Sequence, residues 1–399
     1  MHPLEGITVL DFGFYLAGPV TARLSADLGA RVIKVEEIGG DPRRGIASTF
    51  LFVQRGKEDI ALNLKTDDGR RIVYQLVERA DVVVHNMRVG VAERLGIDYE
   101  TLREINPRLI YCHNAGFGSQ GPGARDPVME PLHSALAGIL HLTGGRGNPP
   151  LRYLSNMDLG CGLNGALTIV MALYERARSG QGQYVEAPQN GASLLCSSDV
   201  YFLNGERSRH LDLDHEQMGH GPLNRLYRTA EDGWICLSAR PQREWEALCA
   251  ALELPRLPQD ERFLTAADRE QQAEALIELL TPRFLTRPAD EWQAILDAAG
   301  VPCEIPQDLP PGSFVNDPDH LASGAVADYV HPRFGRIREI GVPIGFSETP
   351  GRNEAPAPLL GQNTRQILRE LGYDADEIEA LRAKGIVAWE EAVAPAAVG

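Results

Sequence analysis

Short apolar segments alternate with helix-like segments in the first part of the chain. Four of them have the length and β-branched content of strands buried on both faces: 7–12, 31–36, 81–85 and 108–113. Segments with helical periodicity lie between them, at 20–28, 69–80 and 99–107. Such alternation predicts an α/β fold in which helices cover a mostly parallel sheet.

The second half of the chain begins with a long apolar helix and then changes character. The helix is expected over 162–178, with the glycines after Ser179 ending it. A polar stretch rich in glycine and histidine follows near 200–225, and a strand-like segment starts at Trp234. We therefore predict a large domain at 1–200, a small domain at 225–325, and a return to the large domain at 330–399.

Composition limits the classes of partner. The chain has 399 residues, of which 43% are hydrophobic and 24% charged, as in folded soluble proteins. Its formal net charge of -16 disfavours nucleic acid and anionic membrane surfaces as partners. We find neither a basic leader followed by an apolar stretch nor an uninterrupted apolar run of bilayer length, which predicts a cytoplasmic protein with no membrane segment.

Several familiar chemistries are disfavoured by the spacing of their residues. Gly13 and Gly18 do not form the glycine pattern of a dinucleotide-binding turn, although Glu36 ends the second strand where a ribose-binding acid would lie. The histidines at 210, 215 and 220 share no helical or strand face, and the six cysteines include no C-x-x-C pair. No local signature of a hydrolase nucleophile is present. We therefore expect no metal site and no hydrolase triad.

The strongest chemical signal lies at 154–187. Asp158 comes before Gly160, Gly162 and the long apolar helix, so its carboxylate is expected near the positive end of the helix dipole. Aspartate is also a common helix cap, which leaves a purely structural role open. The glycines favour a ligand site, because they let a bulky group approach the backbone and their N–H groups are able to hold an oxyanion.

This segment, D-x-G-x-G followed by the helix and RARSGQGQYVEA, resembles the hallmark of the class III CoA transferases. That family includes formyl-CoA and carnitine-CoA transferases, and α-methylacyl-CoA racemases are relatives. The resemblance continues in order through LEGITVLDF, ADLGARVIKVE, QRGKEDIALNLK and APLLGQNTRQILRELGY. It implies a Rossmann-like large domain built from both termini, a smaller α+β domain, and an interlocked homodimer.

The resemblance also implies roles for particular residues. Asp158 matches the catalytic aspartate, which forms an acyl-aspartyl anhydride and then an aspartyl-CoA thioester, and Glu130 matches a second active-site carboxylate. The substrates implied are an acyl-CoA and a small carboxylic acid, with CoA as substrate and no permanently bound cofactor. CoA contacts are implied for Leu16, Ala17, Leu62, Lys65, Asn86, Met87, Arg94 and Leu95.

The chain departs from the family pattern at several positions. Ile38 stands where the formyl-CoA branch has an arginine directed at the nucleotide, so Arg43 or Arg44 becomes the candidate for phosphate contacts, and Glu58 replaces a cation. Met129 stands at the catalytic histidine of the racemases. Because a thioether carries no proton, this disfavours an acyl-CoA racemase, which would need Glu130 or His133 as its base. A non-catalytic acyl-CoA-binding protein is the remaining alternative.

Overall fold

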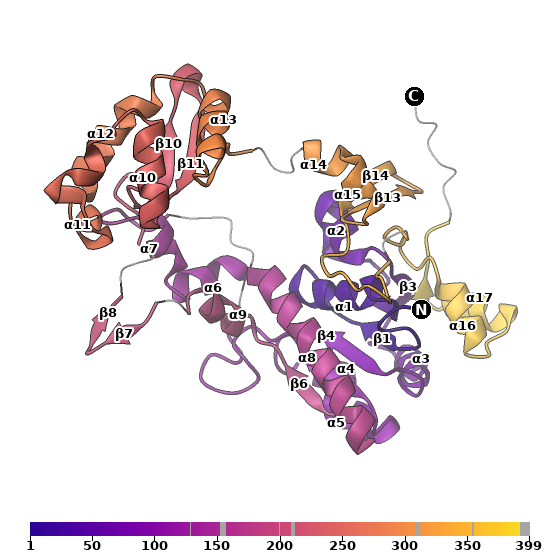
Figure 1. Ribbon diagram of the computed structural model, residues 1–399. Coiled ribbons are helices and arrows are strands. Elements are labelled where there is room, and N and C mark those ends of the chain that lie inside the picture. The colour runs from indigo at the N-terminus through magenta and orange to yellow at the C-terminus, as the bar shows by residue number, and fades with distance from the viewer. Residues whose placement is uncertain are drawn as a thin grey trace. The chain divides into compact units, whose positions relative to one another are not determined.

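The computed structural model consists of two compact units (Figure 1). It describes residues 1–127, 129–151, 157–198, 200–208, 212–307, 312–352 and 355–391. Unit 1 comprises Met1–Ala137, Ser155–Cys196 and Gly312–Gly399, and unit 2 comprises Gly138–Leu154 and Ser197–Pro311. Compared with the predicted domains at 1–200, 225–325 and 330–399, this division places 138–154 and 197–200 in the smaller unit and 312–325 in the larger one.

Unit 1 is built on a seven-stranded sheet in the order β15-β3-β2-β1-β4-β5-β6. All neighbours run parallel except β15, which pairs antiparallel with β3 at one edge. The prediction of an α/β fold with a mostly parallel sheet is therefore confirmed. The strands are β1 (Thr8–Asp11), β2 (Arg31–Glu36), β3 (Glu58–Leu62), β4 (Val82–His85), β5 (Ile110–His113), β6 (Tyr184–Glu186) and β15 (Val387–Ala388).

Both faces of this sheet are buried, which explains the continuous apolar segments in the sequence. Leu10, Ile33 and Val83 face one core, which is completed by helices α3, α5, α16 and α17. Their neighbours Val9 and Val32 face the opposite core, to which α1 and α8 contribute. These helices are α1 (Ala17–Asp27), α3 (Asp67–Val77), α5 (Tyr99–Ile105), α8 (Met157–Ser179), α16 (Thr364–Glu370) and α17 (Ala375–Ala383).

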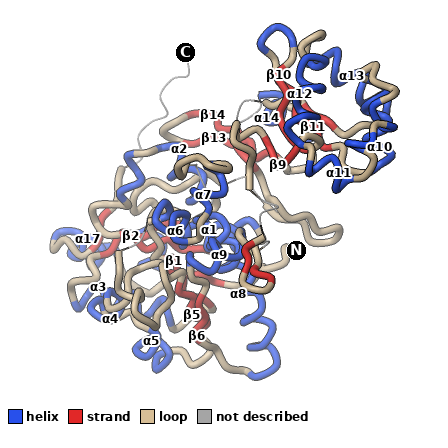
Figure 2. The backbone as a smooth tube through the Cα atoms, turned by 90° about the vertical axis from the view of Figure 1, so that its left-hand side faces the viewer, coloured by secondary structure: helices blue, strands red, loops and turns tan. Residues whose placement is uncertain are grey.

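Helix α8 packs closely against α1 (Figure 2). Two glycines of α8 allow this close approach. A Cβ atom at Gly162 would lie 2.5 Å from Cγ1 of Val20, and one at Gly165 would lie 2.4 Å from Oγ1 of Thr21. Gly162 therefore serves the contact between helices, which corrects the expectation that it opens the backbone to a ligand. The helix also begins earlier than 162, since it is already formed at Met157.

By length and composition, α8 is the one described helix able to cross a membrane, with 23 residues and a mean hydropathy of 1.3. This result stands against the expectation of no membrane-length segment. However, one side of α8 packs into unit 1 through Cys161, Ile169 and Ala172, as the core helix of a globular domain does. Its other side carries exposed apolar residues at Leu163, Leu167, Val170, Met171 and Tyr174.

The remaining elements of unit 1 surround this sheet. A two-stranded hairpin pairs β13 (Val326–His331) with β14 (Gly335–Ile340), and Arg55 joins it to the body of the unit through Glu339 at 2.9 Å. The other helices are α2 (Ala47–Gln54), α4 (Val91–Leu95), α6 (Glu130–Leu136), α9 (Gln189–Cys196), α14 (Gly312–Asn316) and α15 (Pro318–Ala322). Helices α6 and α9 contact each other and α8, the helix whose first turn carries Asp158.

Unit 2 has its own sheet and core. The antiparallel sheet has the order β12-β11-β10-β9, and Trp245, Phe263 and Phe284 are fully buried in the core beside it. Its helices are α7 (Ile139–Gly144), α10 (Gln242–Ala251), α11 (Ala266–Gln271), α12 (Ala273–Phe284) and α13 (Ala289–Ala299). Its strands are β7 (Phe202–Leu203), β8 (Glu206–Arg207), β9 (Gly219–Gly221), β10 (Asn224–Arg228), β11 (Trp234–Ser238) and β12 (Cys303–Glu304).

Candidate functional site

A cleft of about 450 Å³ opens in unit 1 at the carboxyl ends of β1, β2, β3 and β4. This is the edge at which open parallel sheets bind their ligands, because the loops after the strands diverge there. The backbone after each of these strands contributes to the walls. The residues that line the cleft are Phe12–Tyr15, Lys34–Ile38, Gly40–Pro42, Leu62–Lys65, Met87, Val91 and Leu95.

Four of the eight residues expected to contact CoA line this cleft: Leu62, Lys65, Met87 and Leu95. Lys65 is exposed and brings a cation to a protein whose net charge is negative. Arg94 lies one position before Leu95 in α4 and is exposed outside the lining. The strand-end residues expected from the sequence therefore lie together in one cleft, and one exposed lysine is among them.

Leu16 and Ala17 lie at the start of α1, directly after the cleft residue Tyr15. Leu16 packs in a group that includes Leu159, and Ala17 contacts Cys161. Leu159 and Cys161 follow Asp158 directly at the start of α8. The first turn of α1 therefore runs from the cleft to the surroundings of Asp158.

Asn86 does not line the cleft; it fixes the loop that does. Its side-chain Oδ1 accepts from the N–H of Phe14 at 2.9 Å, and its Nδ2 donates to the Phe14 carbonyl at 2.7 Å. A Cβ atom at Gly18 would come within 3.1 Å of the Asn86 Oδ1, which explains the glycine there. The following Tyr15 has a φ of 62°, an unusual conformation for a residue other than glycine.

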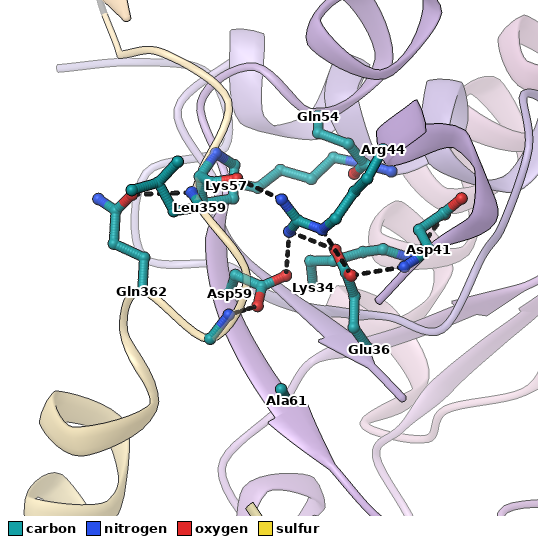
Figure 3. Close-up of polar contacts among 12 residues, drawn as sticks. Lys34, Glu36, Asp41, Arg44, Gln54, Lys57, Asp59, Ala61, Leu359 and Gln362 are labelled. Carbon is teal, nitrogen blue, oxygen red and sulfur yellow. Dashed lines mark hydrogen bonds and ion pairs between the residues drawn. The ribbon is translucent and has the colours of Figure 1, made fainter. Parts of the chain in front are cut away.

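Buried charged side chains hold the same loop, and Lys34 and Lys57 among them are drawn in Figure 3. Lys57 is fully buried, and its Nζ lies 2.7 Å from Oδ2 of Asp11, whose other oxygen accepts from the Gly13 N–H at 2.7 Å. Lys34 donates to the Gly13 carbonyl and lies 3.7 Å from Asp41. Burial lowers the pKa of Lys57 to about 8, even though Asp11 opposes that shift. Both backbone polar groups of Gly13 are therefore held by buried charges.

The two arginines that follow Pro42 have different surroundings. Arg44 donates from Nε and Nη2 to the Glu36 carboxylate, at 2.9 and 2.7 Å, and from Nη1 to the Pro358 carbonyl at 3.1 Å. Glu36 is thus engaged by an arginine, and it does not present a free acid to a ribose. Arg43 instead lies over the Tyr15 ring, 4.9 Å from its centre. Of the two arginines considered for phosphate contacts, Arg44 has its donors occupied.

Asp158 lies in the first turn of α8 and is partly buried. The side-chain amide of Gln189, at the start of α9, donates a hydrogen bond to its Oδ1. Burial and the nearby charge of Glu130 raise the pKa of Asp158 to about 6, while Arg43 lowers it. At neutral pH the carboxylate is ionised but more basic than an ordinary aspartate, which suits a nucleophile that attacks a carbonyl carbon.

Glu130 begins α6, and its charge raises the pKa of Asp158. One turn later His133 is buried, and burial lowers its pKa to about 4. Neither of its ring nitrogens has a hydrogen-bond partner in the described part of the chain, and its ring packs on Phe117. A histidine of such low basicity is a poor base for removing an α-proton.

Sequence reasoning overlooked Gln189. The signal that could have identified it is its position, because it follows β6 at the same carboxyl edge of the sheet as the cleft residues. The groups of three or more histidine, cysteine or acidic residues that a metal ion requires are absent among the described residues. The histidine at 210 lies outside those residues.

Comparison with known proteins agrees with this geometry. The chain matches CoA-transferase family III over residues 4–364. It is 32% identical to the succinyl-CoA:glutarate CoA-transferase of Mus musculus, over 98% of this chain and 92% of that protein. It is 35% identical to the acetyl-CoA:oxalate CoA-transferase of Acetobacter aceti, over 92% and 95% of the two chains.

The fold is also similar to that of a solved structure. A crystal structure of a CAIB/BAIF family protein from Brucella suis superimposes with a TM-score of 0.81 at 30% identity, over 93% of this chain and 99% of that one. Sequence and fold therefore agree along almost the whole chain, through the cleft, Glu130 and Asp158. The chain belongs to CoA-transferase family III and is an enzyme of the CoA-transferase class.

Proposed function

We propose that this enzyme moves CoA from an acyl-CoA thioester to a dicarboxylic acid, with Asp158 as the covalent nucleophile. The observation that carries the proposal is the environment of Asp158. Its carboxylate is partly buried and accepts a hydrogen bond from Gln189, and its pKa is raised by burial and by the charge of Glu130. The dicarboxylic acceptor is inferred from relatives that act on glutarate and oxalate. The cleft beside Lys65 is the proposed site for the nucleotide part of CoA.

The proposed reaction consists of four nucleophilic acyl substitutions, which modify the Asp158 carboxylate and finally release it. An Asp158 oxygen bonds to the thioester carbon, the carbon–sulfur bond breaks, and an anhydride and CoA thiolate result. The thiolate then attacks the aspartyl carbon, which releases the donor acid and leaves an aspartyl-CoA thioester. The acceptor carboxylate attacks that thioester and displaces the thiolate, which finally attacks the acceptor's acyl carbon and frees Asp158. Each intermediate hydrolyses readily, so the partial burial of Asp158 beside α6 and α9 is proposed to limit the access of water.

Glu130 is proposed as the second carboxylate of the site. Its charge keeps Asp158 more basic than an exposed aspartate, which strengthens the nucleophile. It also disfavours the presence of another anion close to the nucleophile, so a dianionic acceptor needs a cation elsewhere in the site.

A homodimer is also proposed. The outer side of α8 presents apolar residues at 163, 167, 170, 171 and 174, which lie on one helical face, and Leu194 and Leu195 of the adjacent α9 are exposed as well. An apolar patch of this extent is typical of a surface that is covered by a partner. A second copy of the chain is the proposed occupant, as the family resemblance implies. The cytoplasmic location predicted from the sequence stays a prediction.

Trapping the intermediate tests the proposed chemistry. The protein is incubated with succinyl-CoA or acetyl-CoA and then treated with hydroxylamine, which converts an activated carboxyl group into a hydroxamate. Peptide mass analysis should find the modification at Asp158, and Asp158→Asn should give none while still binding CoA. Transfer activity accompanied by modification only at other residues would refute the mechanism. A CoA affinity without any exchange, unaffected by Asp158→Asn, would instead identify a non-catalytic CoA-binding protein.

The racemase alternative has its own observable. Proton exchange at the α-carbon would introduce solvent deuterium into the acyl group without an acceptor acid. The low pKa of His133 and the thioether at Met129 leave Glu130 as the base for such a reaction. Deuterium incorporation that depends on Glu130 and needs no acceptor acid would favour the racemase.

A further inference from the structure

Among the described residues, Arg43 is a cation that no ion pair engages, although its neighbours Asp41 and Arg44 are paired. Its neighbour Arg44 donates to Glu36 and to a backbone carbonyl. In the described part of the chain, by contrast, no hydrogen bond or ion pair engages the Arg43 guanidinium, and its Nε is buried without a partner. A buried donor left unpaired is costly, so a site of this kind is suited to a ligand that supplies the acceptor.

The position of Arg43 is fixed by its own turn. Its backbone N–H donates to Oδ1 of Asp41 at 2.8 Å in the short 3₁₀ turn Pro42–Gly45. Its guanidinium lies over the Tyr15 ring, and both Tyr15 and Pro42 line the cleft. The cation is therefore held at the edge of the cleft, where the loop after β1 leads into α1.

Arg43 also acts on the nucleophile through space. Burial and Glu130 raise the pKa of Asp158, and Arg43 is the cation that lowers it. Yet no direct ion pair joins Arg43 to Asp158 among the described residues. The Asp158 carboxylate accepts a hydrogen bond from Gln189 instead. The two groups are therefore near enough for their charges to interact, although no ion pair joins them in the described part of the chain.

A dicarboxylic acid has one carboxylate for the reaction and a second that must also be accommodated. With one end at Asp158, the distal carboxylate would enter a region that already contains Glu130, and a buried carboxylate without a cation is strongly disfavoured. An arginine with free donors provides paired hydrogen bonds for this planar group. Resting on the CoA transfer proposed above, we infer that Arg43 binds the distal carboxylate of the dicarboxylic substrate and so selects dicarboxylic over monocarboxylic acids.

The test compares acids that differ in one carboxylate. Transfer to oxalate, succinate and glutarate is measured beside acetate, butyrate and pentanoate, each pair having equal carbon number. For Arg43→Gln we expect kcat/KM to fall on the order of 100-fold for the best diacid and by less than about threefold for its monoacid. Arg43→Lys should retain part of the preference, because it keeps the charge and loses the planar fork. Arg103 is an exposed arginine on α5, and Arg103→Gln is the matched control. It should leave kcat/KM unchanged for both the diacid and the monoacid.

Other outcomes overturn the inference. Equal losses for both members of a pair, together with weaker binding of free CoA, would assign Arg43 to the CoA phosphates. Unchanged values for diacids would show that it binds no substrate. If the protein transfers no CoA, the proposed function fails, but calorimetric titration of the CoA-loaded protein with each pair of acids still tests Arg43. Tighter binding of the diacid in the native protein, lost in Arg43→Gln, supports the inference; equal binding of both acids refutes it.

Discussion

The side-chain amide of Gln189 donates a hydrogen bond to Oδ1 of Asp158, although 31 positions separate the two residues. Asp158 belongs to the first turn of α8, and Gln189 begins α9 after the edge strand β6. No other hydrogen bond to this carboxylate is present among the described residues. The amide thus fixes the orientation of one carboxylate oxygen and leaves the other for the proposed nucleophilic attack.

Replacing Gln189 with leucine should impair catalysis more than binding. We expect Gln189→Leu to lower kcat by about 10- to 100-fold, because a hydrogen bond to a charged group contributes roughly this much. KM for the acyl-CoA should change by less than about twofold, since Gln189 lies outside the cleft lining. Steady-state kinetics measures both values, with Gln181→Leu at an exposed turn as the control. A rise in KM at unchanged kcat would contradict the assigned role.

The raised pKa of Asp158 predicts the pH dependence of adduct formation. Only the ionised carboxylate attacks, so the single-turnover rate of acylation should rise with pH through a midpoint of about 6. Glu130 raises this pKa, so Glu130→Gln should shift the midpoint to lower pH. Arg43 lowers it, so Arg43→Gln should shift the midpoint to higher pH. Rapid-quench measurements between pH 4.5 and 8 would reveal both shifts, and shifts in the same direction would refute the assignment.

The sheet was predictable because each strand obeys a local rule. Strands buried on both faces must be apolar throughout, and the strand predicted at 31–36 coincides with β2 for this reason. Glycines carry less information, since a small residue does not reveal what approaches it. Gly162 was expected beside a ligand, but Val20 of α1 approaches it instead.

The site was predictable only in part, for a different physical reason. Residues at strand ends, such as Lys65 and Met87, meet because parallel strands share a carboxyl edge. The contact of Gln189 with Asp158 depends on how α6, α8 and α9 pack, and no periodicity encodes that packing. The place of Arg43 depends on Tyr15, whose φ of 62° is not signalled by its residue type.

Lys65 should contribute to the affinity for CoA. It is an exposed cation in the cleft lining and makes no side-chain hydrogen bond or ion pair within the described residues. Lys65→Ala should raise KM for the acyl-CoA by about tenfold, as expected for a hydrogen bond to a charged group, and leave kcat unchanged. Arg94, outside the lining, should give a smaller increase when replaced by alanine. Initial-rate kinetics compares the two variants, and a larger effect at Arg94 would place the phosphates elsewhere.

The buried pair of Lys57 and Asp11 should be sensitive to the loss of one partner. Lys57→Met leaves the Asp11 carboxylate buried without its cation, so we expect a loss of about 3–5 kcal/mol in the free energy of unfolding. Adding Asp11→Asn removes that charge and preserves an oxygen for the Gly13 N–H, so the double variant should recover much of the loss. Urea unfolding of the two single variants and the double variant measures this coupling. If the losses in free energy of unfolding of the two single variants simply add in the double variant, the two charges do not stabilise each other.

The exposed side of α8 should control the oligomeric state. Leu167 and Met171 are 58% and 55% exposed within the chain, so aspartates at both positions should leave the buried side of the helix intact. Burial of each apolar side chain in an interface contributes roughly 1.5–3 kcal/mol, and a buried carboxylate adds a further cost. We therefore expect the double variant to sediment as a monomer at concentrations at which the native protein is a dimer.

Glu175→Gln, a change at an exposed position further along α8, should leave the dimer intact and serves as the control. Circular dichroism should show equal helix content in all three proteins, because only an outer surface has changed. A native protein that sediments as a monomer would refute the proposed dimer. Binding of the native protein to lipid vesicles, abolished by the same aspartates, would assign this face of α8 to a membrane instead.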